Sequence, residues 1–148
     1  MNVNSNPFAT EFAVQETGSS NYVQTGGTLG ASAVWQTDTV WGTQTVTGLS
    51  VNTQYTFQVK ARNGNNTETS FSSTAAKYTL ANVPSAPELE TVSTTAIKII
   101  VKINNNPSPT EFAIRNDTTA QWVQANGTLG ASEVWRTYEN WGSGSGTN

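Results

Sequence analysis

Residues 54–61 read Gln-Tyr-Thr-Phe-Gln-Val-Lys-Ala, and apolar side chains occupy every second position. Successive side chains of a β-strand point to opposite faces, so this stretch predicts a strand with one buried face and one face in water. Residues 97–103, Ile-Lys-Ile-Ile-Val-Lys-Ile, alternate likewise with β-branched side chains, which suit a core strand. No stretch of the chain sustains a helical period of apolar residues. The patterning therefore predicts an all-β protein.

An internal repeat extends this pattern to both ends of the chain. The segment NPFATEFAVQETGSSNYVQTGGTLGASAVWQTDTVWG begins at Asn6 and returns as NPSPTEFAIRNDTTAQWVQANGTLGASEVWRTYENWG from Asn106. Each residue of the first copy has a counterpart 100 positions later, and about half of the aligned residues are identical. A period of this length is too long for a solenoid and matches a small β-sandwich of about 100 residues. We therefore expect tandem β-sandwich repeats.

The composition argues against catalysis. The 148 residues include no cysteine and no histidine, which excludes disulfides, a Ser-His-Asp triad and Cys/His zinc sites. A net charge of −3 gives no electrostatic footprint for nucleic acid. Glu11 and Glu111 occupy the same repeat position, so they do not form a carboxylate pair within one site. We therefore predict a protein that is not an enzyme, with no cofactor, no metal site and no nucleic-acid partner.

Residues 48–63, Gly-Leu-Ser-Val-Asn-Thr-Gln-Tyr-Thr-Phe-Gln-Val-Lys-Ala-Arg-Asn, resemble the E–F corner and strand F of a fibronectin type III domain. That family is an immunoglobulin-like β-sandwich. The resemblance implies that Tyr55 is the tyrosine-corner residue, with its hydroxyl bonded to nearby backbone, and that Leu49 plugs the bottom of the sandwich. Aliphatic residues replace the tryptophan that the family usually carries in strand B.

The resemblance also implies a permuted strand order. Residues 1–80 correspond to strands C to G of one repeat, residues 81–87 to a linker, and residues 88–148 to strands A to C′ of the next repeat. Each part would then leave a hydrophobic face uncovered and a sheet edge open. Three arrangements would cover the hydrophobic face and the open edge. Residues 84–104 could fold back on residues 1–80, or strands could exchange between chains in a swapped dimer or a head-to-tail fibre. In the third, the chain is an excerpt from a continuous array.

Aromatic residues recur at three repeat positions. One interpretation is structural, with one tryptophan in the sandwich core and another over a sheet edge or loop. The other is a flat aromatic platform that stacks sugar rings. Trp41 and Trp141 are the candidates for that platform, because they lie in looser sequence next to glycine. The recurring residues are Tyr22 and Trp122, Trp35 and Trp135, and Trp41 and Trp141.

Together these features predict a non-catalytic structural or adhesive repeat module of the cell surface or extracellular space. Its expected partners are copies of itself, joined by strand exchange or as adjacent repeats in a filament. The alternative is a carbohydrate-binding accessory module of a secreted enzyme, with a polysaccharide as its ligand. No apolar run is long enough for membrane insertion, and we expect the signal peptide to lie outside this fragment.

Overall fold

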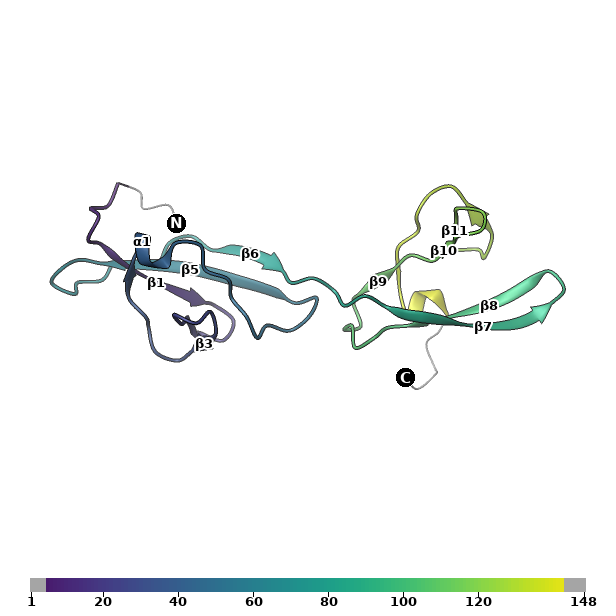
Figure 1. Cartoon of the computed structure of the whole chain (residues 1–148), viewed down its shortest axis with the longest axis horizontal. Coiled ribbons are helices and arrows are strands. Elements are labelled where there is room, and N and C mark those ends of the chain that lie inside the picture. Colours follow the sequence, from purple (N-terminus) through teal and green to yellow (C-terminus); the bar gives the residue numbers. More distant parts are fainter. Residues whose placement is uncertain (1–4, 143–148) are drawn as a thin grey trace. The chain divides into compact units, whose positions relative to one another are not determined.

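The computed structural model describes residues 5–142 and divides the chain into two compact units, Met1–Thr79 (unit 1) and Leu80–Asn148 (unit 2). The regular secondary structure of both units is almost entirely antiparallel strand, which confirms the predicted all-β class (Figure 1). Strand β7 begins at Ser85, so Ser85–Pro87 of the predicted linker lie in a strand. Among the described residues, no helix is long and apolar enough to cross a bilayer.

Unit 1 is built on one six-stranded sheet in the order β3-β2-β1-β5-β6, with β4 paired to β1 off this path. Strands β1 and β5 lie at its centre and match residue for residue from Glu11↔Arg62 to Glu16↔Phe57. The elements are β1 (Glu11–Glu16), β2 (Tyr22–Val23), β3 (Leu29–Gly30), β4 (Gln36–Thr37), α1 (Asp38–Trp41), β5 (Gln54–Arg62) and β6 (Ala75–Tyr78).

The register between β1 and β5 gathers apolar side chains on one face of the sheet. Phe12 pairs with Ala61, and Val14 pairs with Val59, so these side chains share a face. Phe12 and Ala61 are buried together with Val23 and Trp41. This cluster is the core of unit 1.

The opposite face of the same sheet is polar. The Arg62 Nε donates to Glu11 Oε2 at 2.7 Å, and the Gln58 amide donates to Gln15 at 2.9 Å. Both contacts join β5 to β1 across the register. This face is also partly covered, because Ala13 on it is fully buried and the rings of Trp35 and Phe71 lie beside Lys60.

Unit 2 begins with a long hairpin, and the second copy of the repeat follows it in the chain. Strands β7 and β8 form a two-stranded sheet of their own. The repeat follows as two small sheets, β10-β11-β12 and β13-β9. The elements are β7 (Ser85–Ser93), β8 (Ala96–Lys102), β9 (Glu111–Phe112), β10 (Arg115–Asn116), β11 (Gln121–Val123), β12 (Leu129–Gly130), β13 (Arg136–Thr137) and the 3-10 helix η1 (Glu139–Trp141).

The repeated Gly-Thr-Leu-Gly-Ala-Ser motif has a structural role in both copies. The Gln24 amide donates to the backbone carbonyls of Tyr22 and Ser32, at 2.9 and 3.0 Å. A Cβ added to Gly30 would lie 2.9 Å from this glutamine, so any larger residue would displace the Gln24 amide. The same arrangement recurs in unit 2 with Gln124 and Gly130, and we call it the glutamine clamp.

A side-chain acceptor closes the turn after β1. The carboxylate of Glu16 accepts the backbone N–H groups of Gly18 and Ser19, at 2.9 and 2.7 Å, and the Ser19 hydroxyl at 2.6 Å. Its counterpart, Asn116, accepts the backbone N–H groups of Thr118 and Thr119. The same turn is therefore held by a charged acceptor in unit 1 and by a neutral one in unit 2.

The environment of Glu16 sets its ionisation. Burial raises the pKa of the carboxyl, but the hydrogen bonds from Ser19 and Gly18 act in the other direction and together leave the pKa below its ordinary value. A lowered folded-state pKa stabilises the fold above the unfolded-state pKa of about 4.3, and this stabilisation is lost as the pH falls through the folded-state value.

We therefore predict that Glu16→Gln destabilises unit 1 at pH 7 and that the difference from the original protein shrinks toward pH 3. Urea unfolding followed by tryptophan fluorescence at both pH values measures this. Asn116→Ala is the matched control, because it removes a neutral acceptor from the equivalent turn and its cost should not change with pH. A Glu16→Gln difference of equal size at both pH values would contradict the prediction.

Candidate functional site

Tyr55, the predicted tyrosine-corner residue, lies at the start of β5, and Leu49 lies in the segment before this strand. The backbone N–H of Ser50 donates to the Tyr55 hydroxyl at 3.0 Å, the kind of contact that defines a tyrosine corner. Leu49 is half-buried beside this corner. This contact holds the chain where it enters β5. Strand β5 in turn carries Phe57 and Val59, which line an apolar cavity of unit 1.

The two equivalent tryptophans Trp35 and Trp135 have different surroundings. In unit 1, the Arg62 guanidinium carbon lies 4.7 Å from the Trp35 ring centre and the Lys60 Nζ lies 5.3 Å from it. Both cations come from β5. Trp135 is 56% exposed, and its indole N–H donates to Glu133 at 3.0 Å. The exposure of Trp135 follows from the lack of a strand like β5 beside it in the described part of unit 2.

Trp41 and Trp141 are fixed by the same backbone contact. Each indole N–H donates at 2.8 Å to a backbone carbonyl, that of Phe12 for Trp41 and that of Phe112 for Trp141. Trp41 is only 4% exposed, because the short helix α1 turns its ring into the core. A covered ring offers no face for sugar stacking, so the aromatic platform expected at Trp41 is corrected to a core position. Trp141 is half-buried.

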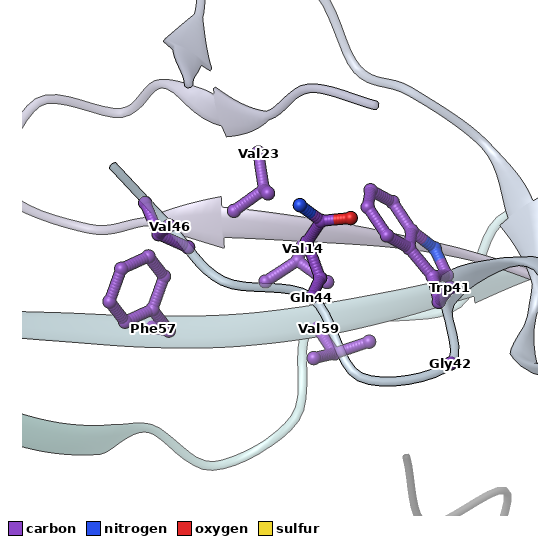
Figure 2. A pocket seen from close by; sticks show the side chains of 8 residues that line it. All are labelled: Val14, Val23, Trp41, Gly42, Gln44, Val46, Phe57 and Val59. Atoms are coloured by element: carbon purple, nitrogen blue, oxygen red, sulfur yellow. The ribbon is translucent and has the colours of Figure 1, made fainter. Parts of the chain in front are cut away.

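An open cavity of about 300 Å³ lies on the apolar face of the unit 1 sheet. Figure 2 shows Val14 of β1, Phe57 and Val59 of β5 and the ring of Trp41 around it. Apart from Gln44 and Gly42, its lining is apolar. We call it the unit 1 cavity; its apolar side chains are buried or half-buried, and the cavity opens to solvent on one side of the core.

A larger open groove of about 920 Å³ lies in unit 2, between the β7–β8 hairpin and the second copy of the repeat. Four of its lining positions are the repeat counterparts of positions that line the unit 1 cavity. One of them is a glycine, Gly42 and Gly142, and the other three carry apolar side chains. We call these three the shared core positions. They are Val14 and Ile114, Val23 and Val123, and Trp41 and Trp141.

The β7–β8 hairpin is amphipathic. Its register places Leu89 opposite Ile99 and Thr91 opposite Ile97, so one face is largely apolar. Leu89 and Ile97 are each 62% exposed. The other face carries two ion pairs, Lys98 with Glu90 at 3.0 Å and Lys102 with Glu88 at 2.9 Å. Large exposed apolar side chains on a regular face indicate an interaction surface.

Sequence reasoning missed the hairpin as a site and considered only the recurring tryptophans, as core residues or as an aromatic platform. The signal was present, because residues 88–90 and 97–99 alternate charged and apolar side chains.

Within residues 5–142, no cluster of acidic side chains is arranged to hold a metal ion. No protein-family model, curated protein or solved structure matches this chain.

We predict that Trp41→Ala destabilises unit 1 by about 3 kcal/mol or more, because it removes a buried ring and leaves a cavity. Trp135→Ala is the matched control at an exposed ring and should cost about 0.5 kcal/mol or less. Urea unfolding followed by far-ultraviolet circular dichroism measures both without relying on the removed fluorophore. Similar losses for the two variants would contradict the assignment of Trp41 to the core.

Proposed function

We propose that this chain is a non-catalytic structural or adhesive repeat module of the cell surface or extracellular space, which associates with copies of itself. The observation that carries the proposal is the pair of uncovered apolar surfaces, the unit 1 cavity and the apolar face of the β7–β8 hairpin. Apolar surface of this kind associates in water because burial removes it from solvent.

The family resemblance supports the same class of function. Residues 48–63 resemble strand F of a fibronectin type III domain, and the Ser50–Tyr55 contact lies where that family has its tyrosine corner. Modules of this kind serve as spacers and adhesive units in arrays. The internal repeat supports an array in which adjacent modules contact one another.

We predict that the mass in solution rises with protein concentration from the 15.8 kDa of a single chain to that of dimers or a ladder of oligomers. Size-exclusion chromatography with light scattering, run from micromolar to near-millimolar protein, measures this. A constant single-chain mass over the whole range would contradict self-association.

Carbohydrate binding is a second candidate, and the exposed ring of Trp135 favours it. If sugars stack there, soluble polysaccharide should quench part of the tryptophan fluorescence of the original protein, and Trp135→Ala should lose that response. Trp41→Phe is the control, since it changes a covered ring and should keep the response. No quenching by any polysaccharide in a panel would leave self-association as the sole candidate.

A further inference from the structure

The two units provide a comparison within one chain, because the repeat places the same residues in two settings. The shared core positions border the cavity in unit 1 and the groove in unit 2. In unit 1 part of the remaining wall comes from β5, through Phe57 and Val59, and part from the segment that contains Gln44 and Val46. In unit 2 the remaining wall comes from the hairpin, through Leu89, Ile97 and Ile99. Within residues 5–142, each unit therefore has one apolar wall without a counterpart in the other unit.

From this complementarity we infer that the apolar face of the β7–β8 hairpin of one chain covers the unit 1 cavity of a second chain. The inference rests on the proposed self-association and specifies its interface. The hairpin meets Ile114 and Val123 across the groove in its own unit, and it would meet Val14 and Val23 in the cavity. The apolar side chains of β5 are an additional contact that unit 2 does not offer.

The loose setting of the hairpin makes it the element that moves. All residues of β7 are exposed, and the groove beside the hairpin is about 920 Å³. β5, by contrast, is matched to β1 along the whole length of β1 and is tied to it by the Arg62–Glu11 contact at 2.7 Å. Moving β5 would break this ladder, whereas moving the hairpin only exchanges one apolar surface that it faces for another.

The charged face of the hairpin fixes its orientation in the complex. The ion pairs Lys98–Glu90 and Lys102–Glu88 lie opposite the apolar face and would lose hydration if buried. Only the face that carries Leu89 and Ile97 can dock without this cost. The hairpin thus has one docking face.

The length of the connection assigns the docked hairpin to a second chain. The open end of the hairpin is at Ser85 and Lys102, and two hydrogen-bonded turns separate it from the start of β9. Strand β9 begins at Glu111, and the repeat counterpart of Glu111 in unit 1 is Glu11. Glu11 pairs with Arg62 at the end of β5. The chain leaves unit 1 at Tyr78, which pairs with Gln54 at the opposite end of β5.

A nine-residue strand such as β5 is roughly 26 Å long, and a sheet packed on it lies about 10 Å away. Residues 79–84 span at most about 20 Å when fully extended. Part of this segment is also fixed, because Thr79 bonds to Thr53 and the Asn82 N–H donates to Asn106 at 2.8 Å. The hairpin therefore cannot reach the equivalent place on its own unit 1.

A cysteine cross-link tests the interface directly, since the chain has no cysteine of its own. Leu89→Cys lies on the docking face of the hairpin, and Gln44→Cys lies at the exposed rim of the cavity. The two full-length variants carry tags of different size and are mixed and oxidised. We expect a disulfide-linked heterodimer on a non-reducing gel. Glu90→Cys, on the opposite hairpin face, is the matched control and should give at least about tenfold less product.

Association measured by light scattering provides the second readout. Ile97→Lys should weaken association by at least about tenfold, whereas Lys98→Gln on the charged face should leave it unchanged. As a control, circular dichroism of each variant tests whether the fold is kept.

The possible outcomes separate the two proposals. Oligomers that form with equal cross-linking from Leu89→Cys and Glu90→Cys would overturn the hairpin interface and leave self-association standing. A single-chain mass at all concentrations would overturn both proposals. A disulfide formed within one chain of the double variant, Gln44→Cys with Leu89→Cys, would overturn docking on a second chain.

Discussion

The pairing of β1 with β5 is the contact on which unit 1 depends. Its register puts Phe12 beside Ala61 and Val14 beside Val59, and this alignment creates the apolar face that the core needs. The same ladder carries the Arg62–Glu11 contact on the polar face. In unit 2, the counterpart of β1 is broken into β9 and β10, and within the described residues neither pairs with a strand equivalent to β5. The repeat sequence alone is thus not sufficient to form the continuous strand.

Several local hydrogen bonds, by contrast, recur in both copies. The glutamine clamp over Gly30 and Gly130, the indole contact of Trp41 and Trp141, and the turn after β1 all recur. These contacts join residues that lie within one copy of the repeat. Strand continuity instead depends on a partner from outside the copy, as expected for a fold dominated by non-local pairings.

These two kinds of contact explain how far the sequence was predictive. Period-two alternation over residues 54–61 and 97–103 predicted strands, and the structure has β5 at Gln54–Arg62 and β8 at Ala96–Lys102. The sequence left open whether Trp41 lies in the core or in an exposed platform, because a tryptophan beside glycine in polar sequence is compatible with exposure unless the turn of α1 is known. The start of β7 inside the expected linker was missed for a similar reason. Pro87 suggests a break, but proline is tolerated in a strand that has a free edge.

The remaining question is why the open apolar surfaces favour another chain over a small ligand. A ligand site normally carries a few polar groups that converge on one point and fix orientation. The unit 1 cavity is lined almost wholly by aliphatic and aromatic side chains, and Gln44, its polar amide, donates to the neighbouring Thr45 carbonyl at 3.2 Å. A surface without directional polar groups selects its partner by shape and area, and a regular strand face such as that of Leu89 and Ile97 provides both. Because the repeat supplies the same core positions twice, the chain itself carries a partner surface of matching character.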